Sequence, residues 1–367
     1  MFRLHHNQQG ISLIELMISM ALGLIIMTAI GSLFVASSRS NSELQKSAAQ
    51  IENGRYAIET ITEDLKHAGF YGQLAVLPAL AGTQDPCVTL SSVALLAATA
   101  LPVQAFRAAD FASRPDISST SCGTLLANVN LAVGSDIIVV RRGDTHTMAP
   151  ADTATTNEVY IQANSAQADI RFGNGNTLAA NGGTANNSTP ATVFKKDLTP
   201  ANVRKYEVHV YFVSPCSVGS GTNGKCASGD DTIPTLKRLE LKVDPSAGSL
   251  AMVIVPLVEG IDYLKAEWGI DNLPTTINVS TQAVGDGIVD SYVAAPSDAQ
   301  LSSAVAAKIF VLARNTESTN GYVDDKTYTL GTVAGTTTTA TNDAFKRHAF
   351  ANEVRFMNLG GRKEIPE

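Results

Sequence analysis

The feature that most constrains this 367-residue chain is a long apolar segment close to its start. Residues 11–36 read ISLIELMISMALGLIIMTAIGSLFVA, and Glu15 is their only charged side chain. A helix rises about 1.5 Å per residue, so this segment is long enough to cross a hydrocarbon core of about 30 Å. It far exceeds the roughly 7–15 apolar residues of an ordinary cleaved secretory signal. The sequence therefore predicts a transmembrane helix over residues 11–36.

The first ten residues, MFRLHHNQQG, form a short cationic leader before this helix. Arg3 and the initiator amine favour a cytoplasmic leader, so everything after residue 36 is expected to be exported. An ordinary signal anchor would explain neither Gly10 nor Glu15. A carboxylate inside a membrane helix costs about 2.5 kcal/mol or more, which makes Glu15 a candidate functional residue.

The segment QQGISLIELMISMALGLIIM resembles the class III signal of type IV prepilins. The resemblance lies in a glycine, an apolar residue after it, and a glutamate five residues beyond that glycine. It implies that a prepilin peptidase removes residues 1–10 by cutting after Gly10, and then methylates the new amino terminus at Ile11. Many pilins have phenylalanine where this chain has Ile11. We expect Glu15 to pair with the ammonium of a neighbouring subunit's first residue in a filament, because a buried charge needs an opposite charge.

The helix is expected to continue past the membrane as an amphipathic segment over residues 37–68. Polar residues enter after Ser37, and apolar residues keep a helical spacing of three or four. Gly69 follows as a candidate C-terminal cap. The recurring apolar residues are Leu44, Ala48, Ile51, Ile58, Ile61 and Leu65.

Residues 69–367 are expected to form one β-rich periplasmic head with long loops. Alternating or β-branched runs predict antiparallel strands, which together with the helix give an α+β fold. The predicted strands lie at 135–143, 158–162, 205–214, 236–244, 251–271, 308–315 and 350–358. Short helices are expected within 91–110 and 298–307, and polar loops at 163–193 and 331–343.

Four cysteines, Cys87, Cys122, Cys216 and Cys226, fit two disulfides in an oxidising compartment. Free thiols are a weaker alternative, and zinc is weaker still because no pair has the spacing of a zinc site. Of the three possible pairings, we favour Cys216–Cys226, because the Gly/Ser-rich loop between them can bring its ends together. Cys87–Cys122 then follows by elimination.

Composition and motifs argue against several other functions. A formal charge of −7 does not suit bulk nucleic-acid binding, which needs a basic patch. Hydrolase motifs such as GxSxG and HExxH are absent, and the six histidines are scattered. We therefore predict no catalytic residue, metal or cofactor. GDGIVD at 285–290 has two aspartates that could serve a calcium loop, but calcium needs about six to eight oxygens and Asp-Gly is a common turn, so we predict a turn.

Five segments of the head resemble the PilW-type minor pilins, which implies a pilin-like fold with the long helix packed on the sheet. The resemblance further implies a minor pilin of the type IV pilus that primes pilus assembly and lies in a tip complex. Its implied partners are other minor pilins, the major pilin, a PilY-type tip adhesin, the prepilin peptidase and the inner membrane. Two alternatives are a J-type pseudopilin of type II secretion and a membrane-anchored extracytoplasmic enzyme. The five segments are 52–72, 256–271, 285–293, 306–315 and 350–362.

Overall fold

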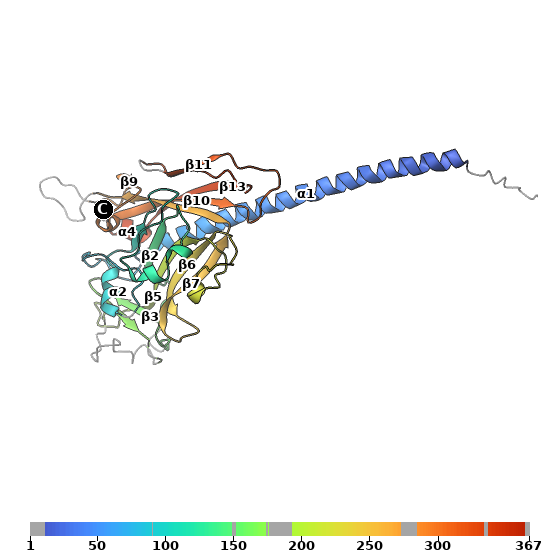
Figure 1. Ribbon diagram of the computed structural model, residues 1–367. Coiled ribbons are helices and arrows are strands. Elements are labelled where there is room, and N and C mark those ends of the chain that lie inside the picture. The colour runs from blue at the N-terminus through green and yellow to red at the C-terminus, as the bar shows by residue number, and fades with distance from the viewer. Residues whose placement is uncertain are drawn as a thin grey trace, which may run out of the picture. The chain divides into compact units, whose positions relative to one another are not determined.

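The computed structural model describes residues 12–89, 91–148, 152–173, 175, 193–272, 285–333 and 337–363 (Figure 1). They fall into two compact units that divide between Ala49 and Gln50. The first unit holds the N-terminal part of helix α1 (Leu13–Lys66), and the second holds the rest of α1 and the head. The predicted α+β fold, with one long N-terminal helix and antiparallel sheets, is confirmed.

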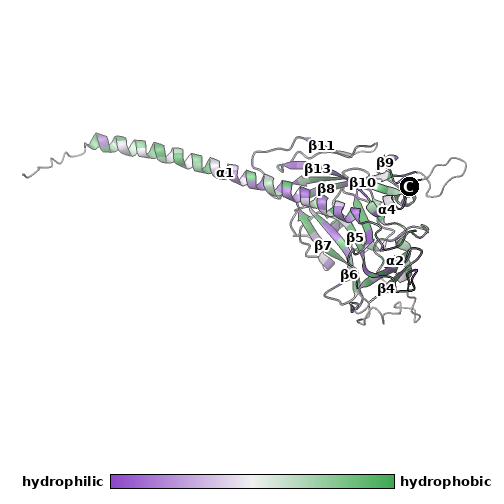
Figure 2. Cartoon of the chain, turned by 180° about the vertical axis from the view of Figure 1, so that it is seen from behind, coloured by the Kyte–Doolittle hydropathy of each residue, from purple (hydrophilic) through white to green (hydrophobic). Residues whose placement is uncertain are grey.

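Within the first unit, α1 carries apolar side chains on every face up to about residue 36. In Figure 2 this part of the helix is coloured mostly as hydrophobic, and the colour becomes mixed further along the helix. A helix that is apolar on all sides is either buried in protein or spans a membrane. Among the described residues, α1 is the one helix whose length and composition suit a membrane span.

The end of α1 depends on a glycine. After Lys66 the last turn tightens, with the His67 and Ala68 amides donating to the carbonyls of Asp64 and Leu65 at 3.1 Å each. Gly69 then has a positive φ of 72°. A side chain there would also lie 2.9 Å from Leu359 Cδ2, so both conformation and space favour glycine.

The larger sheet has seven antiparallel strands, and the longest of them, β5, is at its centre. On one side β5 pairs with β2, which pairs with β1. On the other side it pairs with β3 along its first part and with β6 along its last part. β4 extends from β3, and β7 extends from β6. The bounds are β1 (Val103–Phe106), β2 (Ile137–Gly143), β3 (Val159–Ala163), β4 (Ala168–Phe172), β5 (Val203–Ser214), β6 (Thr235–Val243) and β7 (Leu250–Glu259).

The second sheet has four antiparallel strands in the order β13-β10-β8-β9, and a separate hairpin pairs β11 with β12. Their bounds are β8 (Ile261–Ile270), β9 (Ser291–Val293), β10 (Ala304–Arg314), β11 (Thr327–Leu330), β12 (Thr337–Ala340) and β13 (Arg347–Arg355). The short helices are α2 (Ser92–Ala98), α3 (Asp298–Leu301) and α4 (Met357–Gly361), with 3₁₀ turns η1 (Ser121–Thr124), η2 (Asn128–Asn130) and η3 (Thr222–Gly224).

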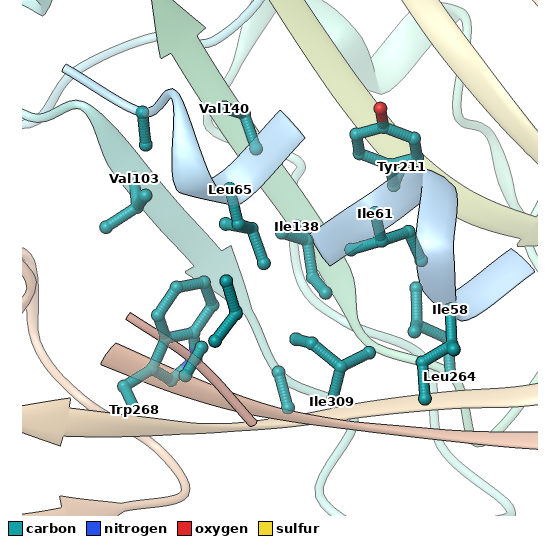
Figure 3. Packing of buried hydrophobic residues seen from close by; sticks show 14 of the residues in the cluster. Ile58, Ile61, Leu65, Val103, Ile138, Val140, Tyr211, Leu264, Trp268 and Ile309 are labelled. Atoms are coloured by element: carbon teal, nitrogen blue, oxygen red, sulfur yellow. The ribbon is translucent and has the colours of Figure 1, made fainter. Parts of the chain in front are cut away.

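The last turns of α1 form the centre of the main core, between the two sheets. In Figure 3, Ile58, Ile61 and Leu65 point toward side chains of both sheets. Full burial of each such side chain stabilises the fold by about 1.5–3 kcal/mol. The surrounding residues include Ile138, Val140 and Tyr211 from the larger sheet and Leu264, Trp268 and Ile309 from the smaller one. A second core lies on the opposite face of the larger sheet and includes Leu95 of α2.

The face of α1 that packs on the head differs from the predicted apolar stripe. Ile51 was expected to be part of it, yet its side chain is 46% exposed. Gln50 and Gly54 are buried instead. Gln50 Nε2 donates to the carbonyls of Ala313 and Lys346, at 2.8 and 2.9 Å. A Cβ on Gly54 would lie 2.1 Å from the Phe350 ring, so the glycine makes room for that ring.

Several predicted boundaries are wrong for local reasons. Residues 251–271 form two strands that are separated at Gly260. Pro256 lies on β7, an edge strand among the described residues, next to the register shift between Leu236 and Lys237 of β6, where a proline is tolerated. The predicted loops contain β4 and β12, and strand β10 begins at Ala304 within the predicted helix 298–307. The predicted helix of 91–110 ends early, and β1 follows Pro102.

Candidate functional site

Glu15 lies in the first turn of α1. Its amide donates to the Ser12 carbonyl at 3.0 Å, and its own carbonyl accepts from Ser19 Oγ at 2.7 Å. The side chain is exposed among apolar neighbours of the first unit. A carboxylate so placed is available to an ammonium on another chain. Gly10 and Ile11, the predicted cleavage and methylation residues, lie outside the described residues.

A buried polar cluster joins the C-terminal part of α1 to the larger sheet. We call it the Asp64 cluster, and its members are Asp64, Arg142, His209 and Tyr211. Asp64 Oδ1 accepts from Arg142 Nε at 2.7 Å. Asp64 Oδ2 accepts from His209 Nδ1 at 2.7 Å and from the Tyr211 hydroxyl at 3.0 Å. Since β2 carries Arg142 and β5 carries the other two partners, the cluster fixes the helix across both strands.

The electrostatics of the Asp64 cluster favour a charged aspartate. Burial alone would raise the pKa of Asp64, but the charges and hydrogen bonds of His209 and Arg142 hold that pKa well below its usual range. Burial and the neighbouring Asp64 carboxylate raise the pKa of Tyr211 far above its usual value, so its hydroxyl stays protonated and can donate. Arg142 also pairs with Glu207 at 2.6 Å.

Sequence reasoning missed the Asp64 cluster, although one signal was present. Asp64 follows Ile61 by three residues and Ala57 by seven, so it lies on the same helical face as the buried residues. A carboxylate on a buried face needs a partner. His209, one of the six scattered histidines, is buried and hydrogen-bonded to Asp64.

A second buried cluster of charged side chains links the β11–β12 segment to the smaller sheet. Arg347 Nε donates to Asp262 at 2.6 Å, and its Nη1 donates to Asp324 at 3.1 Å. Asp343 accepts from both terminal nitrogens of Arg347 at 2.6 Å. The guanidinium thus lies among three carboxylates. Within the described ranges, no group of three or more His, Cys, Asp or Glu side chains is arranged to hold a metal ion.

The segment 285–290, which contains the two aspartates of the alternative calcium loop, forms a turn. Gly287 has a positive φ of 70°. Its amide donates to Asp271 Oδ2 at 3.1 Å, and the Ile288 amide donates to Asp286 Oδ1 at 2.9 Å. Asp290 Oδ2 accepts from the Asn272 amide at 2.8 Å. The carboxylates therefore organise the backbone of the turn itself.

The four cysteines form two disulfides, Cys87–Cys122 and Cys216–Cys226, which is the pairing favoured from the sequence. The first links the segment before α2 to η1, over the second core. The second closes the connection between β5 and β6. Neither disulfide joins the two sheets, so each one restrains a local loop.

The long apolar helix and the antiparallel sheets packed around its end define a pilin-like protein. In comparisons with known families, residues 5–31 match the prokaryotic N-terminal methylation motif, and residues 210–358 match type IV pilus-assembly protein W. Together the two matches support a PilW-type pilin, related to the type IV pilus.

No curated protein and no solved structure matches the chain. The family matches point to a structural pilin-like protein rather than to an enzyme. The methylation motif and the apolar helix support membrane anchoring and association with a pilus. The first match includes Gly10, Ile11 and Glu15, and the second begins inside β5 and ends in α4.

Proposed function

We propose that this chain is a minor pilin that primes assembly of the type IV pilus and lies in a complex at the filament tip. The observation that carries the proposal is the joint occurrence of a prepilin signal and an assembly-protein W head in one chain. The size of the head adds support. A head unit of Gln50–Glu367 with long loops would tile poorly in a dense helical array, which suits a subunit present in few copies.

The leader and the helix suggest how the subunit enters a filament. Prepilin peptidase cuts after Gly10 and methylates Ile11, which keeps a positive charge at the new terminus. Glu15 of one subunit then pairs with the terminal ammonium of its neighbour in an apolar environment. Breaking such a pair by removing one partner costs about 3–5 kcal/mol, so the pair sets the register of adjacent helices.

The head supplies the contacts that distinguish this subunit from the major pilin. Its proposed partners are other minor pilins, the major pilin and a PilY-type tip adhesin, reached from the inner membrane. Because α1 ends inside the main core and is fixed by the Asp64 cluster, the helix end and the head form one folded unit. Contacts made by the head are therefore coupled to the last turns of the helix.

The test is complementation of a null strain with Glu15→Val, measured at native expression level. We expect normal cleavage and membrane insertion, because removing a charge eases insertion. Surface pili should be absent, since the pairing partner of the terminal ammonium is lost. Glu15→Asp should restore part of the piliation, because the charge remains and only its reach shortens. Thr28→Val, a near-isosteric change in the same apolar segment, should restore piliation in full.

The same strains separate the proposal from its rivals. Full piliation with Glu15→Val would contradict the pairing mechanism. A null strain that keeps its pili and loses type II secretion would show that the chain is a J-type pseudopilin. Normal piliation and normal secretion in the null strain would instead favour an anchored protein outside both machines.

A further inference from the structure

The two disulfides differ sharply in the charge that lies beside them. Cys216 is buried, with 1% of its surface exposed, whereas its partner Cys226 is partly exposed. Lys237 of β6 is also buried, at 1% exposure, and its Nζ lies 3.6 Å from Cys216 Sγ. Cys226 is thus the more exposed residue of this disulfide, whereas Cys216 Sγ faces the Lys237 side chain inside the head.

Two carboxylates lie near enough to act on the Lys237 ammonium. Burial lowers the pKa of that ammonium, and the carboxylates of Asp231 and Asp230 offset only part of this effect. A cation beside a cysteine stabilises its thiolate relative to its thiol. Thiol–disulfide exchange is faster when the departing sulfur forms a stabilised thiolate. Cys216 therefore has the surroundings of a good leaving group.

The other disulfide has the opposite surroundings. Both Cys87 and Cys122 are buried, at 4% and 1% exposure. Asp85 Oδ1 accepts from the Cys87 amide at 2.9 Å, and Asp85 Oδ2 accepts from the Ser121 amide at 2.9 Å. This carboxylate lies next to both ends of the bridge, where it disfavours a departing thiolate and repels an attacking one. Cys87–Cys122 is therefore the internal reference for the first bridge.

We propose that Cys216–Cys226 is a reducible, exchange-active disulfide that takes a thiolate at Cys226 and releases Cys216. Its partner in this exchange is a dithiol, of the class found in thiol–disulfide oxidoreductases. The site is independent of the pilin signal and of the pairing of Glu15.

The exchange is balanced in two steps. A thiolate of the dithiol attacks Cys226 Sγ, the bond between the two cysteines breaks, and its electron pair leaves on Cys216 Sγ beside the Lys237 ammonium. The second thiol of the dithiol then attacks the mixed disulfide as a thiolate and releases Cys226. The dithiol loses two electrons and becomes a disulfide, and its two protons reach the two cysteines. Ser214 Oγ lies 3.0 Å from Cys226 Sγ and donates to Asn130 Oδ1 at 3.1 Å; rotation of this hydroxyl would let it donate to the Cys226 thiolate as that thiolate is released.

The loop between β5 and β6 is held by hydrogen bonds of its own, which make the exchange reversible. Asp231 accepts from the amide and hydroxyl of Ser217, at 2.9 and 2.7 Å, and from the Ile233 amide at 2.9 Å. Asp230 Oδ2 accepts from the amides of Ser220 and Ala227, at 3.0 and 2.7 Å. These contacts do not depend on the bridge. Reduction therefore leaves the two sulfurs near each other and ready to be oxidised again.

The first experiment measures reduction of the native full-length protein in detergent with dithiothreitol. Thiols are alkylated at timed intervals and quantified for each cysteine by mass spectrometry. We expect Cys216–Cys226 to be reduced at least about tenfold faster than Cys87–Cys122. Brief exposure to reduced glutathione should give a mixed disulfide on Cys226. Equal reduction rates, or glutathione attached to Cys216, would overturn the proposal without any variant being needed.

The second experiment removes the ammonium. Lys237→Met keeps the length of the side chain, and we expect it to slow reduction of Cys216–Cys226 by about three- to tenfold. Lys242→Met removes a charge from the same strand and should leave the rate of reduction of Cys216–Cys226 unchanged. Lys237→Met should also leave the rate of reduction of Cys87–Cys122 unchanged. In guanidinium chloride the wild-type protein and Lys237→Met should react alike. An unchanged rate for folded Lys237→Met would refute the role of the cation.

Discussion

Asp64 provides the sharpest test of how the helix is attached to the head, and the perturbation is Asp64→Asn. The substitution keeps the shape of the side chain but removes the charge that Arg142 and His209 both contact at 2.7 Å. Removing one partner of a buried pair costs about 3–5 kcal/mol. Because Arg142 keeps a second partner in Glu207, we expect the lower end of that range, about 3 kcal/mol.

The measurement is thermal unfolding of the full-length protein in detergent, followed by circular dichroism. With an unfolding entropy of about 2.1 cal/mol/K for each residue of the head unit, a loss of about 3 kcal/mol lowers Tm by about 4–5 °C. Glu63→Gln is the matched control, since Glu63 is the preceding residue and pairs with Lys66 at the surface. Exposed pairs contribute about 0–1 kcal/mol, so this control should move Tm by about 1.5 °C or less.

The pH dependence supplies an independent check of the same reasoning. The pKa of Asp64 is lowered by folding, so its contribution is fully present above its ordinary value of 3.8. That contribution is lost as the pH falls below this value toward the lower pKa of the folded state. The Tm difference between wild type and Asp64→Asn should therefore shrink below about pH 4. A difference no larger than that of Glu63→Gln at pH 7 would refute the account.

Two further predictions concern glycines. Gly10→Val should block removal of the leader, because the peptidase must accept the residue before the cut. Immunoblots should then show only the longer precursor, and a band of mature size would contradict the assignment of the signal. Gly54→Ala should destabilise the head by about 1–3 kcal/mol, because the added methyl group overlaps the Phe350 ring. At an open helix position the same substitution would stabilise by about 1 kcal/mol. Gly361→Ala, where the added atom meets open space, is the control, and a rise in Tm for Gly54→Ala would disprove the close packing.

Local patterns were sufficient to predict the long helix and the longest strands. The alternation of Tyr206, Val208, Val210 and Phe212 predicted one buried face of β5, and these residues lie together in the second core. The opposite face of β5 was not predicted to be buried, although Tyr211 lies in the main core. A strand buried on both faces loses its simple alternation, so the two cores were not separable from the sequence.

The features that the sequence could not predict depend on contacts between distant residues. Gly54 is an unfavourable helix residue until Phe350 is placed beside it. Arg347 contacts the carboxylates of Asp343, Asp324 and Asp262, which precede it by 4, 23 and 85 residues, so no local sequence pattern predicts these contacts. Strand β12 is short and polar, and strand β4 is only five residues long within a polar stretch, so their pairing with β11 and β3 reveals them.

The main core has a consequence for the order in which the chain acquires its structure. Ile61 and Leu65 of α1 share that core with Val354 and Leu359, which lie near the other end of the chain. During synthesis the helix is made before the strands that enclose it. Contacts of such long sequence separation form slowly, because loop closure must precede them. The main core therefore closes only after β13 and α4 have been made, and until then these elements leave the apolar face of α1 at residues 57–65 uncovered.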